Sequence, residues 1–180
     1  MTITPETKSW TWVLERPCPD CGFDAPALDR VIVGRLVREN ATVWPALLAH
    51  PRARVRPADD RWSALEYACH VRDTFAIFDG RLQRMLGEDH PRFANWDQDQ
   101  SAIDEHYDRQ DPAVVATDLG VAAARIADRF DTVRGAQWNR RGTRSDGADF
   151  TVDSFARYFL HDPVHHVHDV VMGNERLASG

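Results

Sequence analysis

Four of the chain's eight histidines lie close together near its C-terminal end, in the stretch RYFLHDPVHHVHD that covers residues 157–169. They are His161, His165, His166 and His168. In an α-helix, residues four positions apart lie one turn apart on the same face, so His161 and His165 point in the same direction. Two imidazoles in this arrangement suit one divalent cation, as in other helical histidine pairs that bind zinc. The spacing therefore predicts a metal site on a helix.

Two ligands alone bind a cation weakly, so a third ligand is expected, and His70 is the candidate. It lies in the stretch YACHVRD, residues 67–73, which otherwise resembles core sequence. A buried neutral imidazole without a partner is costly, and a metal ion would satisfy it. His168 shares the face of His161 to within about 20° and is a rival ligand. We predict a metal site formed by His70, His161 and His165, with His168 as the alternative.

Other polar residues near these histidines can support the site without binding the metal. His166 has Asp162 and Asp169 at its i−4 and i+3 positions, so we interpret it as part of a solvated or supporting network. Asp73 and Asp162 either orient the ligand imidazoles through their second nitrogens or are surface carboxylates. Pro163 removes an N–H and clashes with the carbonyl one turn earlier, so a kink between the two predicted ligand turns is expected.

A second candidate site is the Cys-x-x-Cys pair of Cys18 and Cys21, in the sequence CPDCG. This is the spacing of half a zinc site or of a redox pair, but a complete structural site needs two more ligands. Thioredoxin-like chemistry would place the pair at a helix start after a strand, which the N-terminal segment does not offer. A turn with two thiols is the simpler interpretation. The alternative is that this segment folds over the bundle and the thiols reach the main metal. Cys69 is interpreted as a small core residue.

Segments with helical periodicity are expected to position these residues. The first covers about residues 27–49, with Asp24 as its N-cap. The second begins at Ser63, where Ser63 and Glu66 form a capping box behind Trp62, a candidate hydrophobic staple, and it stops near residue 87. This second helix carries His70.

Two further helices follow. Asp111 and Pro112 are typical of a helix start, and this third helix is expected to end near residue 135. The fourth is predicted from Thr151 to Gly173, a suitable left-handed C-cap, and carries the histidine cluster. Residues 88–110 are expected to form a short helix or a loop over one end of the bundle, and residues 134–149 an exposed connection or hairpin. In the long connection, candidates for lining a pocket are Asp97, Asp99 and His106. The tryptophans predicted to lie in the core or a pocket wall are Trp44, Trp62, Trp96 and Trp138.

Length and composition limit the possible classes of protein. With 180 residues, 43% of them hydrophobic, the chain can bury one sizeable core. We therefore predict an all-α four-helix bundle over residues 24–173, a lead-in over residues 1–23 and a tail over residues 174–180. A net charge of −6 leaves no basic stripe for nucleic acid. No apolar run approaches the roughly 20 residues of a membrane span, and three cysteines do not form an even disulfide framework, so a cytoplasmic protein is expected.

The chain resembles the DinB-like superfamily, four-helix metalloproteins that include mycothiol-dependent maleylpyruvate isomerases and bacillithiol transferases. The resemblance covers about residues 27–172 and rests on short motifs: Trp62-Ser63, Glu66 and His70 on the second predicted helix, and Thr151-Val152, His161-Asp162 and His165-His166 on the fourth. It implies an up-down-down-up bundle, often dimeric, with zinc or nickel bound by three histidines. Carried over to this chain, these are His70, His161 and His165. Two positions depart from the family pattern: many members have Gln in place of His168, and Pro163 is not part of the pattern.

The resemblance also implies a function. The metal would bind and deprotonate a low-molecular-weight thiol, with mycothiol as the candidate, and the thiolate would attack a small electrophile. The leading hypothesis is thus a thiol S-transferase or isomerase in detoxification or stress response, and a homodimer is the expected assembly. A non-catalytic metal- or small-ligand-binding stress protein is the alternative, and it would have a closed coordination sphere. In a third hypothesis the histidines only join the second helix to the fourth.

Overall fold

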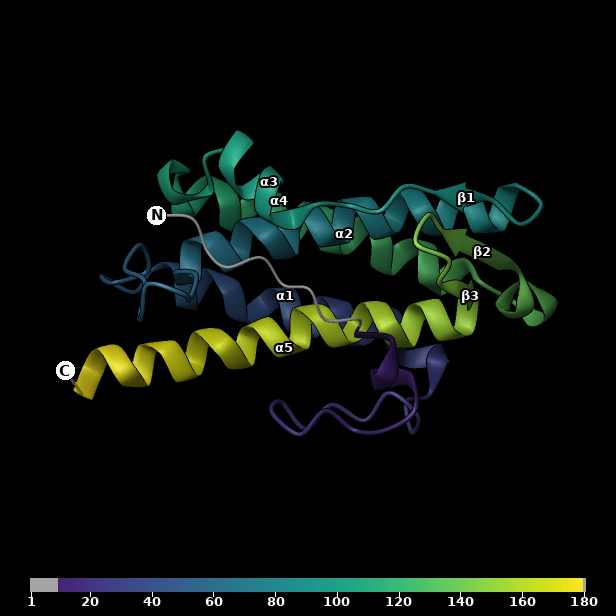
Figure 1. Cartoon of the computed structure of the whole chain (residues 1–180), viewed down its shortest axis with the longest axis horizontal. Helices are drawn as coiled ribbons and strands as arrows, with labels where there is room; N and C mark the ends of the chain where they lie inside the picture. The colour runs from purple at the N-terminus through teal and green to yellow at the C-terminus, as the bar shows by residue number, and fades with distance from the viewer. Residues whose placement is uncertain (1–9, 180) are drawn as a thin grey trace.

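The structure, a computed structural model, describes residues 10–179 of the chain and is mostly helical. Four long helices and one short one follow each other along this part of the chain: α1 (Val33–Leu48), α2 (Ala64–Gly87), α3 (Gln98–Asp104), α4 (Pro112–Thr132) and α5 (Val152–Ser179). α1 and α2 each pack against both α4 and α5, so the long helices form a bundle (Figure 1). The up-down-down-up order of helix directions stays a prediction.

The start of α2 is built as the sequence predicts. The Ser63 hydroxyl accepts a hydrogen bond from the Glu66 amide at 3.3 Å, and the Glu66 carboxylate accepts from the Ser63 amide at 2.9 Å. Trp62 packs edge-on against Tyr67, with 5.5 Å between ring centroids, which is the predicted hydrophobic staple. The buried Glu66 also pairs with the guanidinium of Arg56. These contacts fix the entry to the helix that carries His70.

α1 begins later than predicted. The Asp24 carboxylate accepts a hydrogen bond from the Ala27 amide and closes a turn, so it does not cap the helix. Asp29 has an extended backbone and caps the 3-10 turn η2 (Arg30–Ile32), from which α1 continues. Because the backbone is extended at Asp29, the helix cannot begin before it.

α5 extends beyond its predicted end. The helix runs through Gly173 to residue 179, so this glycine is not a C-cap and most of the predicted tail is helical. A Cβ at Gly173 would lie 3.1 Å from Cγ of Pro57, so the loop before α2 packs closely against the helix here. α5 also continues through Pro163, whose carbonyl accepts a hydrogen bond from the Asn40 side chain at 2.9 Å.

The connections contain a small sheet, which the all-α prediction did not include. Its strands lie in the order β1 (Arg92–Phe93), β2 (Arg141–Arg144) and β3 (Asp149–Thr151), with β1 parallel and β3 antiparallel to β2. The β2–β3 pair is the predicted hairpin, and α3 is the predicted short helix. The sheet lies at one end of the bundle (Figure 1).

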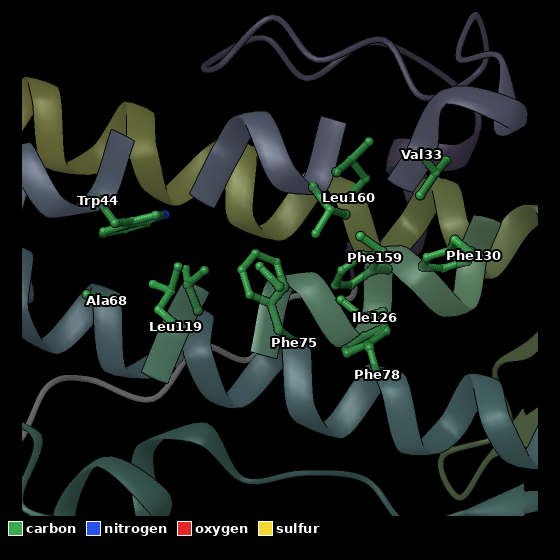
Figure 2. Close-up of a cluster of buried hydrophobic side chains, with 14 of the residues drawn as sticks. Val33, Trp44, Ala68, Phe75, Phe78, Leu119, Ile126, Phe130, Phe159 and Leu160 are labelled. Carbon is green, nitrogen blue, oxygen red and sulfur yellow. The ribbon is translucent and has the colours of Figure 1, made fainter. Parts of the chain in front are cut away.

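The space between the long helices is filled by apolar side chains (Figure 2). Phe159 of α5 lies at its centre and contacts Phe75, Phe78 and Phe130, with 5.9, 5.1 and 5.8 Å between ring centroids. Trp44 is fully buried in the same core. This packing fixes the rotation of α5 about its axis, and therefore decides which of its polar residues face α2.

Within the described residues, no helix combines the length and apolar character that crossing a membrane would require.

Candidate metal centre

The structure distributes the predicted metal ligands over two groups of side chains. Cys18, Cys21, His161 and His165 form one, which we call the cysteine–histidine group. The other, which we call the carboxylate–histidine group, consists of His70, Asp162 and His166. In each group, one possible ligand atom from every residue lies within 4.8 Å of the others. Among the described residues, His70, His161 and His165 do not form such a group together, and their common site stays a prediction.

The helical geometry of α5 explains the division. Successive residues are rotated by about 100°, so a pair shifted by one position along the helix faces another direction. His161 and His165 face the N-terminal segment, where η1 (Trp10–Leu14) packs on α5. Asp162 and His166 face α2 and His70. The purple N-terminal segment can be followed beside α5 in Figure 1.

The carboxylate–histidine group is centred on His70, whose side chain is fully buried. Its Nε2 lies 3.3 Å from Oδ1 and 3.4 Å from Oδ2 of Asp162, and 3.4 Å from the Thr74 hydroxyl. The ring of His166 lies edge-on to it at 4.8 Å. On another side, Trp96 stacks on His70 at 5.1 Å with nearly parallel rings. Two imidazoles and a carboxylate thus meet beside a stacked indole.

Charge is concentrated in this group. Nδ1 of His166 lies 3.0 Å from Oδ2 of Asp169, and its Nε2 lies 3.7 Å from Oδ2 of Asp162. Burial opposes a charge on His166, but Asp162 and Asp169 outweigh it and raise the pKa of His166 to about 9. Burial likewise opposes ionisation of Asp162, but His70 and His166 hold its pKa well below its usual range. The Asp162 side chain is 32% exposed, so solvent reaches the group.

The cysteine–histidine group depends on a tight turn. The Gly22 amide donates to the Cys18 carbonyl and the Cys18 amide donates to the Phe23 carbonyl, both at 2.9 Å. Gly22 has a φ of +73°, which glycine adopts without strain. The turn directs both thiols toward α5, where Sγ of Cys18 lies 3.6 Å from Nδ1 of His165. Burial raises the pKa of the Cys21 thiol to about 11.

Aromatic rings enclose the histidines of this group. Trp10 lies 5.3 Å from the rings of both His161 and His165, and Phe23 lies 6.1 Å from His161. The His161 residue is only 4% exposed. Burial, together with the neighbouring His165, lowers the pKa of His161 to about 4, so its imidazole is neutral at physiological pH. Neutral imidazole is the form that binds metal ions.

Unsatisfied polar atoms indicate that both groups fit a cation. Among the side chains of residues 10–179, the buried nitrogen and oxygen atoms without a hydrogen-bond partner are Nδ1 of His70, Nε2 of His161 and Oδ1 of Asp162. All three belong to the two groups. An unsatisfied buried polar atom costs about 1–3 kcal/mol, and a metal ion can remove this cost at Nε2 of His161 and Oδ1 of Asp162. In His70 the nitrogen that faces Asp162 is Nε2, so Nδ1 does not point to this ion. The donors present in each group are also those that divalent zinc accepts.

The other predicted residues lie outside the two groups. His168 lines a cavity of about 230 Å³ together with Tyr67 and His165. Asp73 accepts hydrogen bonds from Arg72 and the Tyr107 hydroxyl, so it does not orient a histidine. His166, in contrast, belongs to the carboxylate–histidine group, and its contacts with Asp162 and Asp169 agree with the predicted network.

Residues from the long connection and the tryptophans have distinct positions. Asp97 caps α3 and, with Trp96, lines a second cavity of about 450 Å³. His106 is exposed and has a φ of +49° before the turn η3 (Tyr107–Arg109). Asp99 lies in the first turn of α3. The tryptophans predicted as core residues that are buried are Trp44, Trp62 and Trp138.

Two features of the sequence indicate more than the predictions above took from them. The two ligands that the cysteine pair needs to complete a zinc site can be histidines as well as cysteines. Cys-x2-Cys followed by His-x3-His is itself a zinc-ligand spacing. Asp162 was considered as a supporting residue, but it lies four positions before His166, the same spacing as the predicted pair. Both signals were present in the sequence.

Comparisons with known proteins agree with the fold. No curated protein matches the chain significantly. The structure is similar to that of YfiT from Bacillus subtilis, described as a probable metal-dependent hydrolase with an unusual four-helix bundle topology. The TM-score is 0.66 and the identity 16%, over 98% of this chain and 94% of that one. The profile of the DinB superfamily matches residues 36–170, which include α2 and the His161–His165 and Asp162–His166 pairs of α5. The chain therefore belongs to the DinB superfamily.

Proposed function

We propose that the chain is a metal-dependent enzyme whose divalent ion is bound by His70, Asp162 and His166. The observation that carries this proposal is the unsatisfied Oδ1 of Asp162, a buried atom 3.3 Å from Nε2 of His70. Two histidines and one carboxylate are a ligand set of catalytic zinc sites, in which a fourth position stays open. The partial exposure of Asp162 supports access to that position from solvent.

Neighbouring residues support the same assignment. Asp169 lies at hydrogen-bond distance from Nδ1 of His166 and would hold the N–H there, while metal binding would displace the second proton from Nε2, on the side of Asp162. Ligand histidines in metalloproteins are commonly oriented by a carboxylate in this way. Trp96 covers one face of His70 and shields it from water. Both histidine ligands are therefore held by a contact that does not depend on the metal.

A divalent ion in this position would lower the pKa of a coordinated thiol or water and so supply a nucleophile at neutral pH. We propose a low-molecular-weight thiol, with mycothiol as the candidate, and a small electrophile as the second substrate. The family supports a thiol-dependent S-transferase or isomerase in detoxification or stress response. The cavity beside Trp96, lined by Ile77 and Phe93 with Arg81 and Asp97, suits a small, partly apolar substrate.

Hydrolysis is the second candidate, because YfiT is a probable metal-dependent hydrolase. In that case water takes the place of the thiol, while His70, Asp162 and His166 keep their positions. The two candidates differ only in the ligand that enters the open position. A single set of assays can therefore separate them.

The test compares turnover of the zinc- or nickel-loaded protein, with and without added thiol, using small electrophiles and activated esters. Thiol-dependent consumption of the electrophile is expected. His70→Gln and Asp162→Asn should abolish it, whereas His168→Gln, in neither group, should not. Ester cleavage without thiol would favour the hydrolase. A metal-loaded protein that neither turns over substrate nor binds thiol would support the non-catalytic metal- or small-ligand-binding protein.

The third hypothesis, in which the histidines only join two helices, predicts a different result. If these residues only join α2 to α5, His70→Gln lowers stability and no variant changes a rate, because the wild type has none.

The proposal further includes a cytoplasmic homodimer with the up-down-down-up bundle of the resemblance. Sedimentation at several protein concentrations measures the oligomeric state.

A further inference from the structure

We propose that Cys18, Cys21, His161 and His165 bind a structural zinc ion, separate from the ion of the proposed enzyme site. The site joins the N-terminal segment to α5. It uses the pair of α5 that the carboxylate–histidine group leaves free. The inference does not depend on any activity of the protein.

The donor set and its spacing point to zinc. Cys-x2-Cys combined with His-x3-His falls within the spacings of structural Cys2His2 sites. A tetrahedral set of two sulfurs and two nitrogens favours zinc over magnesium or calcium, which prefer oxygen. For Zn–S of about 2.3 Å and Zn–N of about 2.0 Å, a tetrahedron places sulfur and nitrogen about 3.5 Å apart. Sγ of Cys18 and Nδ1 of His165 lie 3.6 Å apart.

The protein's own contacts hold the ligands of this site together without a metal. The turn at Gly22 presents both thiols on one side, and its two backbone hydrogen bonds fix their separation. His161 is 4% exposed and its Nε2 has no hydrogen-bond partner among the described residues. Trp10 and Phe23 enclose the group and limit access of water. A disulfide between the two cysteines would leave Nε2 of His161 unsatisfied, whereas a zinc ion satisfies it.

The arrangement is that of a structural site. Four protein ligands complete the tetrahedron and leave no position for a substrate, which distinguishes structural from catalytic zinc. The ligands also come from distant parts of the chain, since Cys18 and His165 are 147 positions apart. A metal that closes so long a loop restricts the unfolded chain and holds the N-terminal segment on the bundle.

The decisive experiment is cobalt substitution of the purified, reduced full-length protein. Cobalt bound by cysteines gives a thiolate-to-metal absorption band. We expect this band in the wild type. X-ray absorption of the zinc form of His70→Gln, which lacks a ligand of the other site, should show about two sulfur and two nitrogen neighbours. Cys18→Ser and Cys21→Ser should lose the band and one equivalent of metal, and the matched control Cys69→Ser should keep both. Absence of the band from the wild type overturns the proposal.

The same spectra separate this site from the proposed enzyme site. His70→Gln should abolish metal-dependent turnover and leave the thiolate band intact. Conversely, loss of the band in His70→Gln would mean that one ion is shared and would overturn the assignment of two sites. A protein without turnover that shows the band supports the zinc site alone.

A measurement on the wild type covers the case in which the cysteine variants do not fold. Metal-bound thiolates react slowly with alkylating agents, so Cys18 and Cys21 should be protected in the zinc-loaded protein and become reactive after chelation. Mass spectrometry of the labelled peptides distinguishes them from Cys69. Equal labelling before and after chelation, or a Cys18–Cys21 disulfide in the purified reduced protein, contradicts the proposal.

Discussion

The His161–His165 pair and the Asp162–His166 pair occupy the same two turns of α5 and differ by one position in the sequence. One pair meets two thiols from the N-terminal segment, and the other meets an imidazole from α2. The difference teaches that the rotation of a single helix determines the chemistry of its donors. Two thiols complete a closed tetrahedron, whereas a single imidazole leaves a metal with an open position.

The surroundings of the two pairs differ as much as their partners. His161 is enclosed by aromatic rings, and burial with the neighbouring His165 lowers its pKa to about 4. His166 is also buried, but Asp162 and Asp169 raise its pKa to about 9. At neutral pH one pair is therefore uncharged, and the other holds a positive charge between two carboxylates. An uncharged enclosure suits a structural role, and a charged, partly exposed group suits chemistry.

The largest expected effect tests whether the two groups depend on different parts of the fold. Glu66→Gln removes the charge that accepts hydrogen bonds from the Arg56 guanidinium and weakens the cap of α2, which should lower the free energy of unfolding by about 3 kcal/mol. Because only the carboxylate–histidine group uses α2, its metal affinity should fall while the thiolate band of the cobalt form remains. Chemical denaturation and metal titration measure both. Equal losses at the two groups would contradict their independence.

A smaller effect is expected from the cysteine–histidine group. Cys18→Ser should lower the free energy of unfolding by about 2.7 kcal/mol when free zinc is 100-fold above its dissociation constant. Chelation of the wild type should reproduce this loss, and it should cause no further loss in the variant. Thermal or denaturant unfolding with and without chelator is the measurement. Hydrogen exchange should also become faster at Val13, which is buried in η1.

A third prediction concerns the carboxylate beside His166. Asp169→Asn weakens the acceptor for Nδ1 of His166 and should reduce metal affinity of the carboxylate–histidine group by about 10–100-fold. Isothermal titration with zinc measures it. Asp146→Asn, in the hairpin between β2 and β3, removes a more exposed carboxylate that belongs to neither group and serves as the control. Unchanged affinity in Asp169→Asn would argue that Asp169 does not orient the ligand.

The last prediction is a dependence of stability on pH. Burial opposes ionisation of Glu66, but Arg56 and Ser63 outweigh it and lower its pKa below 4.5. A lowered pKa contributes stability above the unfolded-state pKa, and this contribution is lost as the pH falls through the folded-state value. Unfolding curves between neutral and acidic pH should therefore show a loss of stability below about pH 4.5 in the wild type. Glu66→Gln should lack this component, and an identical pH profile would refute it.

Local signals in the sequence predicted much of the fold. The capping box of α2, the Asp111-Pro112 start of α4 and the β2–β3 hairpin each depend on neighbouring residues, and the structure confirms them. The end of α5 was predicted too early because Gly173 is explained by Pro57, which is distant in the sequence. A local rule does not include such a contact.

The candidate site was less predictable for the same reason. The His-x3-His spacing identified a helix face with metal ligands, but it did not indicate what that face meets. Cys18 and His165 come together only through the packing of the whole chain. The position of His70 inside a core-like stretch was enough to predict it as a ligand. That Asp162 lies beside His70 depends on the rotation of α5, which Phe159 and the rest of the core impose.

The separation of Cys18 from His165 also affects how the protein is made. The thiols leave the ribosome early, and the histidines that face them follow only when the last helix is synthesised. Until α5 is made, the cysteine turn therefore has no histidine partners, and zinc can bind there later only if both thiols stay reduced. The N-terminal segment can settle on α5 only after the residues of α5 have emerged.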